Sequence, residues 1–146
     1  MTRRITLAVT AVTLVAAGCN IRPRPLAPSP NEGSIISRDD IAETGARTMW
    51  EALQRTVKYT MFQEDGRGTP ERVRRRGASS IVLSDDMPIF VDNVRIGDVV
   101  MLSQMNAVDI EHIQVLNGVY ATTYYGTNAG DGVILIFTRE AQREVS

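Results

Sequence analysis

The stretch from Pro88 to Arg139 constrains the fold most, because short apolar runs alternate along it with turn-forming residues. Ile89-Phe90-Val91 predicts a strand, and the Asp92-Asn93 pair after it suits a tight reversal, since both residue types tolerate positive φ. Asp98 predicts the start of a short helical segment. The apolar run at 132–138 is typical of a central strand that is covered on both faces. The stretch thus predicts, in order, a strand, a tight turn, a short helix, a strand, a short helix, a glycine-rich turn and a strand.

A second strand is expected between these elements, at 109–116. Its alternation puts Ile113 and Val115 on one face and His112 and Gln114 on the other, polar face. His112 is the only histidine in the chain. No second metal-type ligand stands near it at a useful spacing, so we interpret it as a solvated surface residue rather than a metal or catalytic ligand.

The residues at 118–126 predict a short helix that ends in Tyr-Gly. Tyr120, Tyr124 and Tyr125 are candidates for a partner-contact surface. The alternative is that one or two of them pack on the sheet with their hydroxyl groups in water. Thr127 to Gly132 then predicts a tight turn before the last strand.

The first half of the domain predicts a helix, with Ser37 as its N-cap and an apolar stripe that continues to Val57. Gly45 weakens the middle of this helix, and Trp50 falls close to the stripe as a core anchor. Residues 61–70 carry Gly66, Gly68 and Pro70 and predict a loop. Ile81-Val82-Leu83 predicts a further short strand.

Arginines crowd the segment at 71–76, where Arg72, Arg74 and Arg76 alternate with Val73 and Arg75. One interpretation is a basic strip that contacts an acidic partner. The other is an exposed edge strand, on which charges discourage unwanted strand pairing.

The N-terminus resembles a bacterial lipoprotein signal. Arg3 and Arg4 precede a 13-residue uncharged run, Ile5 to Ala17, which is too short to span a bilayer of about 30 Å but fits a secretory signal peptide. The run ends in a lipobox-like sequence at Cys19. We therefore predict that Cys19 is lipidated, and that it anchors the chain through acyl chains that contribute about 0.8 kcal/mol per buried CH₂.

Cys19 is the only cysteine, so an exported domain is expected to hold together through its core and not through disulfides. Asn20 follows it and, by analogy with other lipoproteins, favours the outer membrane, with the periplasmic side preferred. Four prolines within Asn20 to Gly33 predict an extended tether. Without residues 1–18 the chain has 14 basic and 17 acidic residues, a formal charge of −3. That balance gives no reason to expect a nucleic-acid partner.

Four segments follow from these patterns. They are a signal peptide at 1–18, a lipid anchor and tether at 19–35, a folded domain at 36–140 and a C-terminal tail at 141–146.

Several short motifs, in this order, resemble the plug domain of TonB-dependent outer-membrane receptors. They are Arg76-Gly77, the Val91-Asp92-Asn93 turn, the stretch from Asp109 to Leu116 (DIEHIQVL) and the helix from Gly118 to Gly126 (GVYATTYYG). Asn93 stands where plug domains usually have glycine. The resemblance covers about Ile36 to Arg139, and it implies a small mixed α/β domain with a sheet of about four strands flanked by short helices. At 146 residues the chain has room for a plug-like domain but not for barrel strands.

No catalytic, cofactor-binding or metal-binding constellation is evident, so we do not expect an enzyme. Two hypotheses remain. One is an interaction module tethered to the outer membrane, which contacts an envelope protein or receptor. The alternative is a membrane-tethered binding protein for a small ligand related to receptor-mediated uptake. An aromatic content of 5% favours the first.

Overall fold

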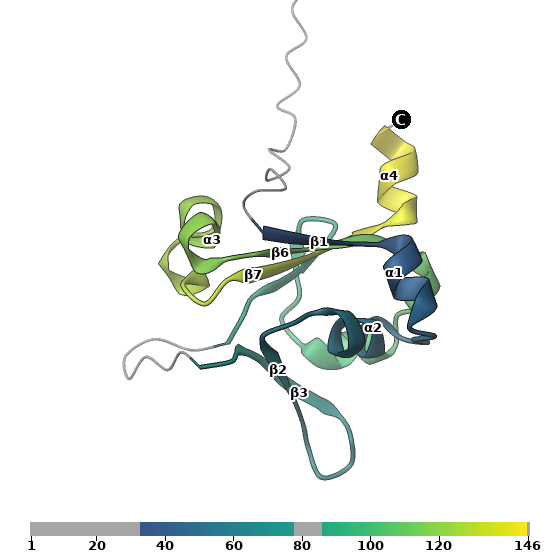
Figure 1. Ribbon diagram of the computed structural model, residues 1–146, viewed down its shortest axis with the longest axis horizontal. Coiled ribbons are helices and arrows are strands. Elements are labelled where there is room, and N and C mark those ends of the chain that lie inside the picture. Colours follow the sequence, from purple (N-terminus) through teal and green to yellow (C-terminus); the bar gives the residue numbers. More distant parts are fainter. Residues whose placement is uncertain (1–32, 78–85, 146) are drawn as a thin grey trace, which may run out of the picture.

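The computed structural model describes residues 33–77 and 86–145, which fold around a five-stranded sheet (Figure 1). The strands stand in the order β1 (Gly33–Ser37), β6 (Ile110–Leu116), β7 (Val133–Thr138), β4 (Ile89–Val91) and β5 (Val94–Arg95). All neighbours are antiparallel except β4 and β7, which are parallel. The predicted mixed α/β fold is confirmed, with five strands in the sheet instead of about four.

The central strand is β7, as its uninterrupted apolar sequence predicts. Val133 to Ile136 are all at least 98% buried, because helices cover both faces of the sheet. Strands that are buried on both faces lose the alternation of polar and apolar residues.

One face of the sheet carries the main core, covered by α1 (Arg38–Glu43), α2 (Met49–Thr56) and the 3-10 helix η2 (Val99–Ser103). Ser37 is the N-cap of α1, as predicted, and it forms a capping box with Asp40. The single long helix is wrong. Gly45 adopts a φ of 66° and separates α1 from α2, and strand β1 precedes α1 and takes in residues that we had assigned to the tether.

Beneath this core, β2 (Thr60–Glu64) and β3 (Pro70–Arg75) form a hairpin that projects from the body of the domain (Figure 1). The loop predicted at 61–70 is therefore wrong at its start, and only the tip is a turn. Trp50 from α2 holds the hairpin, since its Nε1–H donates to Glu64 Oε1 (2.7 Å) and its ring meets Phe62 edge-on at 5.3 Å. Trp50 is 3% exposed, which confirms its predicted place in the core.

The opposite face is covered at one end by α3 (Gly118–Tyr125) and η4 (Thr127–Ala129), with a smaller core of its own. Ala121, Leu116 and Leu135 lie at its centre. The predicted helix at 118–126 is confirmed. The polar face predicted for β6 is wrong for Gln114, which is only 3% exposed and lies in register between Ile35 of β1 and Leu135 of β7.

After β7 the chain continues as the α-helix α4 (Arg139–Val145). The sequence predicts the end of the domain and a tail in this region. The 3-10 helix η3 (Ala107–Asp109) leads into β6. The predicted strand at Ile81-Val82-Leu83 lies outside the described residues, as do Cys19 and the predicted signal and tether up to residue 32.

Candidate interaction surface

The predicted arginine strip lies on the hairpin, but its three arginines differ in their positions and in their partners. Arg72 and Arg74 are on the outward face of β3, opposite Gln63 and Met61 of β2. Arg74 Nε lies 3.4 Å from Asp86 Oδ1, and Arg72 forms a looser pair with Glu71 at 4.0 Å. These partly exposed pairs contribute little to stability. Arg76 lies just beyond the strand, where its N–H donates to the Tyr59 carbonyl (2.9 Å).

Of the three tyrosines predicted as contact candidates, two are exposed and one packs on the sheet. Tyr120 and Tyr124 are exposed on α3, whereas Tyr125 packs on Phe90 of the sheet with ring centroids 4.7 Å apart. That burial raises the pKa of the Tyr125 hydroxyl. Tyr125 is thus a packing residue, and Tyr120 and Tyr124 are available for contact.

Tyr59 is a contact candidate that the sequence patterns missed. It precedes β2, leaves 81% of its surface exposed and has a φ of 59°. A left-handed backbone is unfavourable for a residue with a bulky side chain, by roughly 1–2 kcal/mol. Strain that persists at an exposed aromatic residue is the kind of outlier that points to a functional role.

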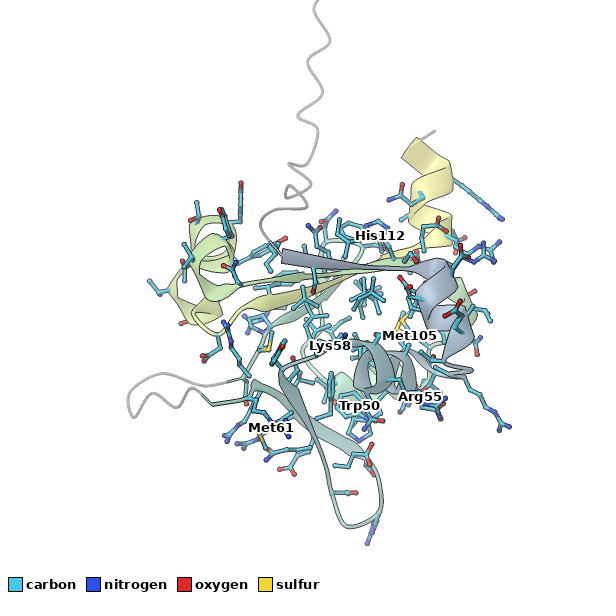
Figure 2. The ribbon with its side chains drawn as sticks, viewed as in Figure 1. Trp50, Arg55, Lys58, Met61, Met105 and His112 are labelled. Atoms are coloured by element: carbon cyan, nitrogen blue, oxygen red, sulfur yellow. The ribbon has the colours of Figure 1, made fainter. Side chains whose placement is uncertain are left out.

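Cations stand beside Tyr59. Lys58 is exposed, and Figure 2 shows it between the sheet and the base of the hairpin. Arg75 is exposed at the end of β3, where it pairs in register with Thr60. Within residues 33–77 and 86–145, neither cation forms an ion pair. Both therefore remain open to an external anionic group.

We name the hollow between these residues and the start of α3 the hairpin–α3 groove; it is lined by Lys58, Tyr59, Arg75, Asn117, Val119 and Tyr120. It consists of two adjoining hollows of about 160 Å³ and 450 Å³ that share Arg75 and Asn117. Val119 is 76% exposed next to Tyr120, and the lining carries two cations, Lys58 and Arg75, and one carboxylate, Asp131. Gly33, the first described residue, also lines the groove.

Helix α3 has a fixed position at this groove. Asn117 is its N-cap and accepts a hydrogen bond from the Tyr120 N–H (3.3 Å). Gly118 follows, and a Cβ there would collide with the carbonyl oxygen of Gly130. The close contact between the helix start and the turn before β7 therefore requires glycine.

A second hollow, the turn–α4 groove, has a volume of about 590 Å³ and mixes both signs of charge; its lining includes Asp92, Asp109, Arg139, Glu140 and Arg143. Asp92 organises one wall. Its carboxylate accepts from the Thr138 N–H (2.8 Å) and from Thr138 Oγ1 (2.7 Å), and the Oγ1 in turn caps α4 at Ala141. Asp92 and Asn93 have φ values of 47° and 67°, as predicted for this turn.

His112 lies on the sheet face away from the main core (Figure 2). It is only half-exposed, because it stacks on Phe137 with centroids 4.5 Å apart and planes 15° apart. Burial lowers its pKa, and the neighbouring Glu111 carboxylate partly opposes that shift. The expectation of a fully solvated histidine is wrong for this reason.

Residues 33–77 and 86–145 contain neither a candidate metal site nor a helix that could span a membrane. In those ranges no three acidic, histidine or cysteine side chains gather as a metal site would require. Nor does any helix in them have the length and apolarity needed to cross a bilayer.

The fold and the ordered motifs define a receptor plug domain. The family model described as the TonB-dependent Receptor Plug Domain matches residues 25–133, and this chain belongs to that family.

Among known proteins, the vitamin B12 transporter BtuB of Vibrio cholerae serotype O1 is 32% identical over 114 residues, which are 75% of this chain and 18% of the transporter. The TonB-dependent receptor SusC of Bacteroides thetaiotaomicron is 38% identical over 84 residues, 51% of this chain and 8% of the receptor. The chain thus spans less than a fifth of the length of these relatives.

Solved structures show the same fold. The RagAB peptide importer in its open-open state superposes with a TM-score of 0.57 at 28% identity, over 74% of this chain and 12% of the importer chain. The ferric enterobactin receptor PfeA of Pseudomonas aeruginosa gives 0.54 at 22% identity, over 77% of this chain and 18% of the receptor, and it supports the fold alone.

Proposed function

We propose that this chain is a lipid-anchored outer-membrane protein whose plug domain binds a partner protein of the cell envelope through the hairpin–α3 groove. The observation that carries this proposal is Tyr59, a strained and exposed tyrosine that lines one hollow with Lys58 and Arg75, neither of which forms an ion pair among the described residues. Tyrosine and arginine are enriched at sites that dominate the energy of protein interfaces. Related proteins are named as transporters and receptors, so the proposed role is non-catalytic.

The partner segment that this groove fits is acidic. Its lining carries two cations, Lys58 and Arg75, against one carboxylate, Asp131, and it includes the side chains of Tyr59 and Tyr120. Carboxylates of a partner would pair with the cations while its apolar groups cover Val119. Exposed Arg72 and Arg76 extend the positive charge along the hairpin and favour association with an acidic surface.

The proposed anchor at Cys19 keeps the domain near a membrane. Gly33 lies fourteen positions after Cys19 in sequence, and a chain of that length reaches at most about 50 Å. Because Gly33 lines the groove, the tether would hold this side of the domain within that distance of the lipid surface.

A second candidate function, binding of a small ligand, is favoured by the turn–α4 groove. Its volume of about 590 Å³ lies within the range of ligand pockets. The relatives named for vitamin B12 and peptide transport make a small polar or peptide ligand the class to test.

Co-purification in mild detergent tests the first function. The full chain should retain one specific envelope protein, and Arg75→Ala should release it while Arg55→Ala, another exposed arginine outside the groove, retains it. Equal retention by both variants would contradict the proposed groove. A saturable thermal shift with a small ligand, without any stable protein partner, would support the second function instead.

A further inference from the structure

The two edges of the sheet differ in how they resist pairing with another strand. β5 is two residues long and ends in the exposed Arg95, and both short length and charge protect an edge. β1 has five residues, Gly33–Ser37, without a charge or a proline. Its register with β6 runs without a bulge. This edge lacks the features that normally prevent strand addition.

The hydrogen bonds further inside the sheet show which way the β1 backbone points. The Ile134 N–H donates to the carbonyl of Pro88 (3.0 Å), so Ile134 directs its backbone groups toward β4 and away from β6. Its partner in register on β6 is Val115, whose backbone groups must then point to β1. Ser34 is opposite Val115, so Ser34 bonds inward. By alternation, Ile35 directs its N–H and C=O outward.

Two independent observations agree with this assignment. A Cβ on Gly33 would collide with the Val115 carbonyl oxygen, so that carbonyl does point at β1. At the other end, the Ser37 N–H donates to Asp40 Oδ2 (2.9 Å) and not to β6. Gly33 and Ile35 therefore present their N–H and C=O groups at the open edge, and no other strand of the described residues lies beside them.

From this geometry we propose that two copies of the chain pair through β1, antiparallel, about a two-fold axis at Ser34. In this register Gly33 of each copy is opposite Ile35 of the other. Each of these two pairs exchanges two hydrogen bonds, which uses every outward group of both residues. The interface is isologous and closes as a dimer.

The side chains suit a second copy as the occupant. The Ile35 side chain is 48% exposed, and in this register it packs over the backbone of the partner's Gly33, which has no side chain in the way. Ser34 meets Ser34 at the axis, and the strand brings no like charges together. The contact is short, so we expect weak association in solution, strengthened wherever copies share one membrane.

Sedimentation of the full chain in mild detergent over a wide concentration range tests the pairing. We expect a reversible monomer–dimer equilibrium. Ile35→Pro removes only outward N–H groups, two of the four hydrogen bonds across the axis, and should weaken dimerisation roughly 10- to 100-fold with an unchanged circular dichroism spectrum. Ile36→Pro serves as the comparison variant. The Ile36 N–H bonds inward to β6, so the loss of this hydrogen bond should destabilise the fold.

Disulfide trapping supplies a second readout. Ser34→Cys should crosslink two copies, because residues of a non-hydrogen-bonded antiparallel pair have Cα atoms about 4.5 Å apart. Val94→Cys is the control, since position 94 is 66% exposed and lies on β5, at the opposite edge of the sheet. The parent chain, which retains Cys19, accounts for crosslinks through that residue.

A chain that stays monomeric at every concentration would overturn the proposal. So would a dimer that Ile35→Pro leaves intact, or Ser34→Cys crosslinks no stronger than those of Val94→Cys. The purified chain is used without any partner or membrane, so these results are independent of the proposed function.

Discussion

Tyr59 holds a left-handed backbone conformation that glycine adopts without penalty. Its carbonyl accepts a hydrogen bond from the Arg76 N–H, but little of its side chain contacts the described residues, because 81% of the residue is exposed. The side chain is therefore explained by what it contacts outside the domain, and the stability of the domain and its binding should respond in opposite directions to its removal.

Tyr59→Gly should raise the free energy of unfolding by about 1 kcal/mol, since it relieves the left-handed strain, and should weaken partner binding. Urea unfolding measures the first effect and co-purification the second. Asn93→Gly, at a φ of 67°, is the matched control: asparagine tolerates this region, so the gain should be smaller. A destabilised Tyr59→Gly would mean that the tyrosine supports the fold.

His112 should make stability depend on pH. Its pKa in the folded chain lies below the ordinary 6.5 because burial against Phe137 disfavours the charged ring. Below pH 6.5 the unfolded chain therefore binds more protons than the folded chain. The contribution of His112 to the free energy of unfolding is complete above pH 6.5 and falls as the pH drops toward the lowered pKa. His112→Phe, which keeps a stacked ring, should remove this slope.

Denaturant unfolding at several pH values between neutral and mildly acidic checks this expectation. Asp40 and Asp65, whose pKa values are lowered by hydrogen bonds to Ser37 and to the Thr69 and Arg67 N–H groups, lose their contribution only at still lower pH. An identical slope in wild type and His112→Phe would contradict the role of His112.

Among the elements, α3 depends on one glycine contact. Gly118→Ala should destabilise the domain by roughly 1–3 kcal/mol, because the new methyl group meets the Gly130 carbonyl and must displace the helix or the turn. Gly97→Ala is the control, since no atom lies within 4 Å of the position of its Cβ. Thermal and urea unfolding compare the two variants. Equal stabilities would show that α3 is free to shift.

Elements with strong local signals were predictable, and those set by long-range contacts were not. The apolar run of β7, the Asp92-Asn93 turn and the Ser37 cap follow from properties of the residues themselves. Strand β2 was missed because its sequence is mostly polar and only Trp50 and β3 make it a strand.

The candidate groove was likewise predictable only in part, because local residue properties indicate some of its residues and long-range contacts bring in the others. Charge and aromatic content singled out Arg72, Arg76, Tyr120 and Tyr124, but Lys58, Tyr59 and Arg75 meet Asn117 only through the tertiary fold. The strain at Tyr59 is a backbone property that no residue pattern reveals.

For the whole molecule, the anchor is the first property to establish. Cys19→Ser should abolish incorporation of labelled palmitate and release the chain from the membrane fraction, since acyl chains supply the proposed attachment. Wild type and Asn20→Ser serve as lipidated controls. A Cys19→Ser chain that still carries palmitate and sediments with membranes would exclude this anchor.

Photo-crosslinking in intact cells tests the central claim, binding of an envelope protein through the hairpin–α3 groove. A photoreactive residue at Tyr59 should yield one discrete crosslinked protein, identified by mass spectrometry, and the yield should fall in an Arg75→Ala background. The same residue at Val94, 66% exposed on the opposite edge of the sheet, should yield none. Equal crosslinking from both positions, or no discrete product from Tyr59, would contradict the account.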